Sequence, residues 1–145
     1  MRRTAWMAGL VVVAAAVVAA QAGKVVKSSD GACQATVPAS WIAGSLPSTA
    51  NSADKSLTIV VSSPKMIDSF DELKKTAQTV YKESKVTKDS ATEFEMQGKS
   101  VTGTPDVYRA IPGAAGKYCI AEVTYQSGTA DDVRKIALTL KATGK

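Results

Sequence analysis

The sequence predicts a single α+β domain in which an antiparallel sheet of about five strands is flanked by two helices. Three observations predict this fold class. Five segments carry the alternation of half-buried strands, two carry capped amphipathic helix patterns, and the order is β-β-α-β-β-β-α. Residues 23–145, which hold all of these segments, can bury one hydrophobic core and are too few for two.

An export signal precedes this domain. Met1–Arg3 is a basic start, residues 5–20 form an apolar run, and Ala20-Gln21-Ala22 has the small-residue pattern that signal peptidases cleave. We therefore expect residues 1–22 to be removed and the mature protein to be periplasmic or secreted, in a bacterial cell envelope. The alternative is an uncleaved membrane anchor, but the run is shorter than the roughly 20 residues of a spanning helix and is rich in alanine.

The first two expected strands lie before the first helix. In residues 33–37 and 55–62, apolar side chains alternate with mainly polar ones, which is typical of half-buried strands. Residues 23–32 are expected to be a lead-in. Residues 43–54 are small and polar and include Gly44 and Pro47, so they predict a long loop.

Residues 69–83 predict the first helix. Ser69 and Glu72 form a capping box, and apolar residues recur at helical spacing behind it. A lysine cluster in and after this segment is interpreted as a solvated helix face, with a weak contact to an anionic surface as the alternative. Its members are Lys74, Lys75, Lys82, Lys85 and Lys88.

Three strands and a second helix follow. Residues 92–97 predict a strand with Phe94 and Met96 inward and Glu93 and Glu95 outward. Two further strands are expected at 107–111 and 117–126, joined by a hairpin loop at 112–116. The last helix is expected at 131–140, with Thr129 as its N-cap.

The two cysteines, Cys33 and Cys119, predict a disulfide because the chain is expected to be exported. Two separate buried thiols are the alternative. Each cysteine begins the apolar face of its strand, so antiparallel neighbours in exact register would hold them apart. A bond therefore implies parallel neighbours, a large register offset, or a bridge to something that crosses the sheet, and the sequence leaves these three open.

Composition excludes several function classes. The chain has no histidine, which excludes Ser-His-Asp and Cys-His catalysis and every histidine-ligated metal site. The mature chain has 16 basic and 13 acidic residues, which is too weak a charge for a dedicated nucleic-acid binder. We expect no catalytic residue, no metal, no cofactor, no nucleic-acid partner, no membrane span after cleavage, and a monomer.

Three aromatic residues, Trp41, Tyr108 and Tyr118, are the candidate binding surface. Tyr108 and Tyr118 lie on either side of the hairpin at 112–116, where they could pair across it. Trp41 adjoins the segment 43–54, with which it would wall a groove for a ligand or a partner, or else pack beneath it.

The sequence also resembles a known family. Val37-Pro38-Ala39-Ser40-Trp41 after the first strand, Val60-Val61-Ser62 at the end of the second, and Ser69-Phe70-Asp71-Glu72-Leu73 at the helix start are similar to the PsbP/DcrB-like proteins, over about residues 31–141. The resemblance implies an α/β/α sandwich and a function that is mostly non-enzymatic. Family members include accessory subunits of the photosynthetic oxygen-evolving complex, a nuclear-transport GTPase-binding factor and bacterial envelope proteins. This chain lacks the lipid-attachment cysteine of many bacterial members.

Three functional hypotheses follow from the sequence. The first is an exported, non-catalytic binding or accessory protein that recognises a protein or a small ligand. The second is an envelope hydrolase or lyase that works without histidine, for which Glu93 and Glu95 are one candidate acid pair, roughly 7 Å apart on one strand. The third is a structural or stress-related envelope protein.

Overall fold

The described part of the chain, residues 22–144, folds into two antiparallel sheets and two helices in a computed structural model of the protein. The predicted α+β class is confirmed. The sheets have more strands than the sequence indicated, and the second sheet was not predicted.

The larger sheet has seven strands in the order β3-β4-β5-β9-β8-β7-β6. Its strands are β3 (Ile42–Ala43), β4 (Thr49–Asn51), β5 (Leu57–Ser62), β6 (Lys85–Asp89), β7 (Phe94–Lys99), β8 (Pro105–Pro112) and β9 (Tyr118–Tyr125). The smaller sheet has the order β1-β2-β10, with β1 (Lys24–Lys27), β2 (Cys33–Val37) and β10 (Lys141–Ala142). All neighbouring strands are antiparallel.

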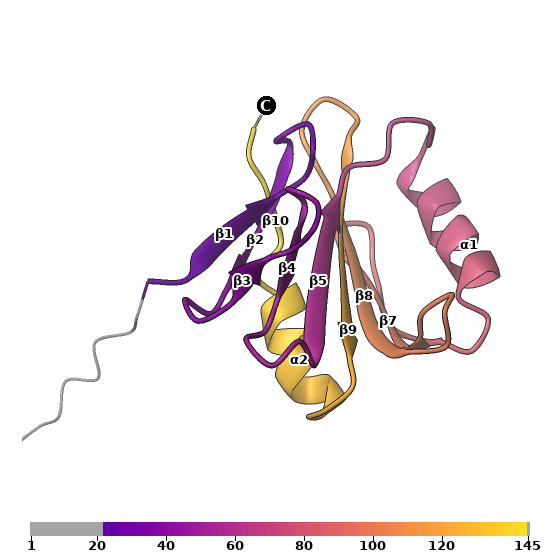
Figure 1. The fold of residues 1–145 in the computed structure, drawn as a ribbon. Helices are drawn as coiled ribbons and strands as arrows, with labels where there is room; N and C mark the ends of the chain where they lie inside the picture. Colours follow the sequence, from indigo (N-terminus) through magenta and orange to yellow (C-terminus); the bar gives the residue numbers. More distant parts are fainter. Residues whose placement is uncertain (1–21, 145) are drawn as a thin grey trace, which may run out of the picture.

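The larger sheet is covered on both faces (Figure 1). Helix α1 (Phe70–Val80) covers one face, and helix α2 (Ala130–Ala137) and the smaller sheet lie over the other. Two separate clusters of buried apolar side chains correspond to these two layers. We call the two sides of the larger sheet the α1 face and the α2 face.

Strand alternation assigns side chains to the two faces. On β7, Phe94 and Met96 are buried against the α1 layer, as predicted. Glu93 and Glu95 were expected to point outward, and for Glu95 this is wrong, because its side chain is 1% exposed on the α2 face. Both faces of this strand are covered. Its side chains therefore alternate between the α1 layer and the α2 layer, and not between the core and solvent.

Both helices begin at their predicted caps. The Ser69 Oγ accepts the Glu72 N–H at 3.1 Å, and the Thr129 Oγ1 accepts the Asp132 N–H at 3.3 Å. Helix α1 ends at Val80, three residues before the predicted end, because Tyr81 leaves the helical backbone conformation. That early end matters for the site described below.

The predicted loop at 43–54 is wrong in part. It contains β4 and the end of β3, which extend the larger sheet beyond β5. Ala50 pairs with Ile59 and is buried, while the flanking Thr49 and Asn51 are only half-buried. A three-residue strand with one small apolar residue carries too little alternation to be recognised in sequence.

Strands β1, β6 and β10 were also not predicted. Strand β1 lies within the expected lead-in at 23–32, and β10 has only two residues. Strand β6 is the edge of the larger sheet and all five of its residues are exposed, so it has no apolar face to recognise. Its lysines suit an exposed sheet edge, where charge opposes pairing with another chain.

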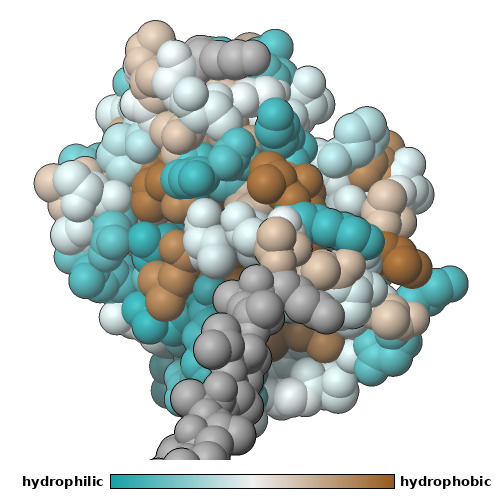
Figure 2. Space-filling view, turned by 90° about the vertical axis from the view of Figure 1, so that its left-hand side faces the viewer, coloured by the Kyte–Doolittle hydropathy of each residue, from teal (hydrophilic) through white to brown (hydrophobic). Residues whose placement is uncertain are grey.

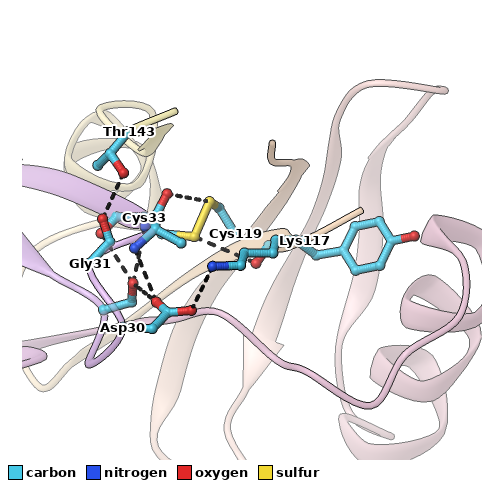
Figure 3. Close-up of a disulfide and its surroundings, with 9 residues drawn as sticks. Asp30, Gly31, Cys33, Lys117, Cys119 and Thr143 are labelled. Atoms are coloured by element: carbon cyan, nitrogen blue, oxygen red, sulfur yellow. Dashed lines mark hydrogen bonds and ion pairs between the residues drawn. A yellow bond between two sulfur atoms is a disulfide. The ribbon is translucent and has the colours of Figure 1, made fainter. Parts of the chain in front are cut away.

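The predicted disulfide between Cys33 and Cys119 is present (Figure 3). The alternative of two separate thiols is therefore wrong. Cys33 lies on β2 of the smaller sheet and Cys119 lies on β9 of the larger one, with a Cα–Cα distance of 5.4 Å. Because β2 and β9 belong to different sheets, they are neither parallel neighbours nor partners with a register offset, and the third geometry left open, a bridge to something that crosses the sheet, is the nearest to the observed one.

Polar contacts surround the disulfide in Figure 3. Asp30 accepts the Ser28 hydroxyl at 2.7 Å and the Ala32 N–H at 3.0 Å, and Lys117 Nζ lies 3.6 Å from its second oxygen. The Ser28 and Ala32 hydrogen bonds lower the pKa of Asp30 to about 2. These contacts fasten the β1–β2 turn beside the bond between the sheets.

The predicted export signal falls almost wholly on residues 1–21, which lie outside the described residues. Within residues 22–144, neither helix combines the length and the hydropathy needed to span a membrane.

Candidate binding site under helix α1

Tyr108 and Tyr118 do not pair across the hairpin, so that prediction is wrong. The register of β8 and β9 places Tyr108 opposite Glu122 and Tyr118 opposite Pro112. Both tyrosines are nevertheless buried on the α1 face. Tyr118 stacks on Phe70 of α1, with ring centroids 5.9 Å apart.

Trp41 is buried, with 4% of its surface exposed, and it also lines a hollow of about 320 Å³. The other walls come from β1, β3 and β4, and the Lys24 Nζ donates to the Trp41 carbonyl at 2.5 Å. Figure 2 views this side of the molecule and shows hydrophobic side chains between hydrophilic ones. Val25, Ile42 and Leu46 are large apolar residues exposed in these segments. The binding role predicted for Trp41 remains a prediction.

A second hollow, of about 220 Å³, lies between helix α1 and the sheet. Helix α1 and its flanking residues supply one wall, and β5, β8 and β9 supply the other. The apolar lining residues are Val60, Ile67, Leu73, Ala77, Val80 and Ile120. The polar lining residues are Ser62, Thr76, Tyr81, Tyr108 and Glu122. Glu122 is the one acidic side chain among them.

The early end of helix α1 positions the polar side of this hollow. Tyr81, which follows the helix, packs against Tyr108 with ring centroids 5.2 Å apart, and its hydroxyl donates to the Glu122 Oε2 at 2.8 Å. Burial and the Glu122 carboxylate raise the pKa values of both tyrosines. Both phenols therefore stay protonated at physiological pH, and Tyr81 serves as a hydrogen-bond donor.

Behind Glu122 lies a second carboxyl group, that of Asp106 on β8. Asp106 faces Thr124 in the sheet, one diagonal step from Glu122, and it is 1% exposed. Within the described residues, no donor group contacts either Asp106 oxygen, and the polar neighbour of this carboxyl group is the Glu122 side chain, with which a protonated Asp106 can hydrogen-bond. Burial, and then the charge of Glu122, raise the pKa of Asp106 to about 7.

Positive charge is missing from this carboxyl pair. Among residues 22–144, neither Asp106 nor Glu122 forms an ion pair with a lysine or an arginine. A buried charge without a partner is costly, and unpaired buried acids concentrate at functional sites.

The acid pair proposed from the sequence, Glu93 and Glu95, is arranged quite differently. Arg109 of β8 contacts both carboxylates, at 2.9 Å for Glu93, and Arg134 of α2 reaches Glu95 at 2.7 Å. Arg109 lowers the pKa of Glu93. These ion pairs hold the two acids in place and connect α2 to the sheet, and neither acid lines the two hollows described above.

The lysine cluster is likewise not a uniform solvated face. Lys74 is buried, and its Nζ donates to the Asp89 Oδ1 at 2.6 Å and to the Ser90 carbonyl at 2.7 Å, linking α1 to β6. Asp89 raises the pKa of Lys74. Lys88 pairs with Glu93 at 3.1 Å, so two of the five lysines are engaged within the domain.

Sequence reasoning missed Asp106, Glu122 and the role of Tyr81. Asp106 preceded the expected strand at 107–111, and Tyr81 was assigned to the apolar stripe of α1. A usable signal was present, because Asp106 is in phase with Tyr108, and Glu122 is in phase with Tyr118, on strands whose other residues on that face are mostly apolar. Within the described residues, no cluster of three or more acidic or cysteine side chains is arranged to hold a metal ion.

No protein-family model matches the sequence, and no curated protein is significantly similar to it. Among solved structures, the chain is similar to the solution structure of cyanobacterial PsbP (CyanoP) from Synechocystis sp. PCC 6803, with a TM-score of 0.49 and 11% sequence identity. The match covers 83% of this chain and 92% of that chain.

Proposed function

We propose that the chain is an exported, non-catalytic binding or accessory protein of the bacterial cell envelope, and that its binding site is the hollow under helix α1. The observation that carries this proposal is the uncompensated carboxyl pair at that hollow, Glu122 on its wall and Asp106 behind it. The arrangement provides a shaped apolar space with one oriented charge, which is the composition of a small-molecule or side-chain binding site.

The disulfide supports the exported part of the proposal. Bonds between cysteines persist in oxidising compartments outside the cytosol and are rare inside it. Cys33 and Cys119 are fully buried, so the bond is part of the core and not a surface redox site. The predicted signal sequence at residues 1–22 supports the same location independently.

The hydrolase alternative requires two carboxyl groups that both face a substrate. Asp106 is almost fully buried and is absent from the lining of the hollow, so its oxygens do not reach a molecule bound there except through Glu122. General acid–base catalysis needs the catalytic group within hydrogen-bond reach of the reacting atom. The geometry therefore favours binding over bond cleavage.

Photo-crosslinking in the native envelope tests the proposal. A benzophenone side chain in place of Thr76, which is exposed and lines the hollow, should capture a ligand or partner. The matched control is Thr79, which is exposed on the same helix but does not line the hollow. A product from Thr76 alone, lost in Glu122→Gln, supports the proposal. Equal products from both positions, or none from Thr76, would contradict it.

A further inference from the structure

The hollow under α1 combines two properties that restrict what it can hold. Its walls are mainly aliphatic, and its polar end is acidic, because neither Glu122 nor Asp106 forms an ion pair with a lysine or an arginine in the described part of the chain. An anionic ligand would be repelled by the Glu122 carboxylate. A neutral apolar ligand would leave the charge uncompensated.

The size of the hollow sets the scale of the ligand. Its volume of about 220 Å³ corresponds to roughly seven non-hydrogen atoms, taking about 30 Å³ for each, the volume of a water molecule in the liquid. This is below the roughly 300–1,000 Å³ of sites for drug-sized molecules. A short chain fits, whereas a sugar ring with its hydroxyl groups would meet mostly aliphatic walls.

We propose that the hollow binds a primary alkylammonium group, with its apolar chain between α1 and β5 and its charged nitrogen at Glu122. The ligand class is a short aliphatic amine, free or at the end of a lysine side chain of a partner. This inference rests on the proposed function and names the chemistry of its site. Tyr81 fixes one oxygen of Glu122 by donating to it, so the carboxylate is oriented before the ligand arrives.

Asp106 connects this binding to pH. In the free protein near neutral pH, Asp106 holds a proton because it is buried beside Glu122. A bound ammonium supplies the missing positive charge and lowers the proton affinity of Asp106, so binding releases at most one proton to solvent for each ligand. Binding should therefore tighten as pH rises to about 7 and become constant above it.

Titratable groups from β8, β9 and the end of α1 surround Asp106. Glu122 lies on β9, Tyr108 on β8, and Tyr81 after α1, and the two phenols remain protonated through this range. The residues of β5 and β7 on the same face are not ionisable. Asp106 is therefore the group in this cluster that titrates near neutral pH.

The experiment is a titration of the mature protein with n-butylammonium, followed by calorimetry and by amide NMR shifts, at pH 8 and pH 6. We expect saturable binding at pH 8, about tenfold weaker binding at pH 6, and shifts at Val60, Thr76 and Ile120. In Asp106→Asn, where the amide stands in for the protonated acid, this pH dependence should disappear. In Glu122→Gln, affinity should fall at least about tenfold.

Two controls keep the result interpretable. n-Butanol has nearly the same size without the charge and should bind at least about tenfold more weakly. Glu83→Gln removes an exposed carboxylate outside the hollow and should leave affinity unchanged. Equal binding of butanol and butylammonium, shifts confined to the α2 face, or no saturable binding by folded protein would overturn the inference. If butylammonium does not bind while the benzophenone at position 76 still captures a specific product, the proposed ligand class is wrong and the proposed binding function stands.

Discussion

The two faces of the seven-stranded sheet both bury carboxyl groups, and they do so in opposite ways. On the α2 face, Glu95 is 1% exposed and contacts both Arg109 and Arg134. On the α1 face, Asp106 is equally buried, and its nearest charged neighbour is another carboxyl group, Glu122. The two acids lie on adjacent strands of one small domain, with opposite electrostatic surroundings.

The difference separates structure from function. When a buried acid lies between two arginines, its ion pairs replace the interactions with water that it lost on burial. Removing one arginine therefore destabilises the fold. When a buried acid lies beside another acid, nothing replaces those interactions with water. Such an arrangement weakens the folded state unless a ligand supplies the opposite charge. The difference supports a structural role for the Glu95 cluster and the binding role that we propose for the Asp106–Glu122 pair.

The largest effect should come from the bond that fastens the α2 face. Replacing Cys33 and Cys119 by alanine opens a loop of 86 residues. The free energy of unfolding should fall by about 4–5 kcal/mol in the chain-entropy description, measured by urea denaturation. The α1 hollow lies on the other side of the sheet, so butylammonium affinity in the remaining folded protein should not change. A loss below about 1 kcal/mol would contradict this account of the bond.

The next largest effect should come from breaking the arginine cluster. Arg109→Met leaves Glu95 buried with only the half-exposed Arg134 as a partner, and should lower the free energy of unfolding by about 3–5 kcal/mol. Lys88→Met is the matched control, because it removes a cation that pairs with Glu93 in an exposed position, and should cost under about 1 kcal/mol. If the two variants lost similar amounts of unfolding free energy, the buried cluster would contribute no more to stability than an exposed ion pair.

On the α1 face, removing a buried charge should stabilise the protein. The folded state holds the Asp106 proton more tightly than the unfolded chain, because its pKa is raised from 3.8 to about 7. Stability should therefore fall as pH rises from about 4 to about 7 and then stay level. Asp106→Asn should lack that fall and be more stable than wild type by about 2–4 kcal/mol at pH 8, with almost no difference at pH 4. If Asp106→Asn were less stable than wild type at pH 8, the predicted direction of the stability change would be wrong.

The smallest effect should come from the two helix caps. Ser69→Ala and Thr129→Ala each remove one N-cap hydrogen bond and should each cost about 1 kcal/mol. Only helix α1 forms a wall of the hollow, so only Ser69→Ala should also weaken butylammonium binding. Equal effects on affinity would mean that α1 does not position the site.

Local patterns in the sequence predicted the elements with strong local signals. Strands β2 and β9 have clean alternation, and Ser69 and Thr129 cap their helices through contacts a few residues away. Strand β6 was missed because an exposed edge strand has no apolar face. Its identity depends on pairing with β7, which no short window contains.

The site was less accessible to sequence reasoning. The burial of Glu95 depends on Arg109 and Arg134, which come from other elements. The expected pairing of Tyr108 with Tyr118 was wrong because the hairpin register is set by the loop, which places Tyr108 opposite Glu122. Alternation can place an acid on a face, but only the folded chain shows whether a cation lies beside it.

The most direct test is a carbon-13 NMR titration of the Asp106 side-chain carboxyl in the mature protein, with and without n-butylammonium. The account predicts a midpoint near pH 7 in the free protein and a midpoint lower by one unit or more with saturating ligand. A midpoint near 4, the value of an ordinary aspartate, that does not move on adding the amine would contradict it.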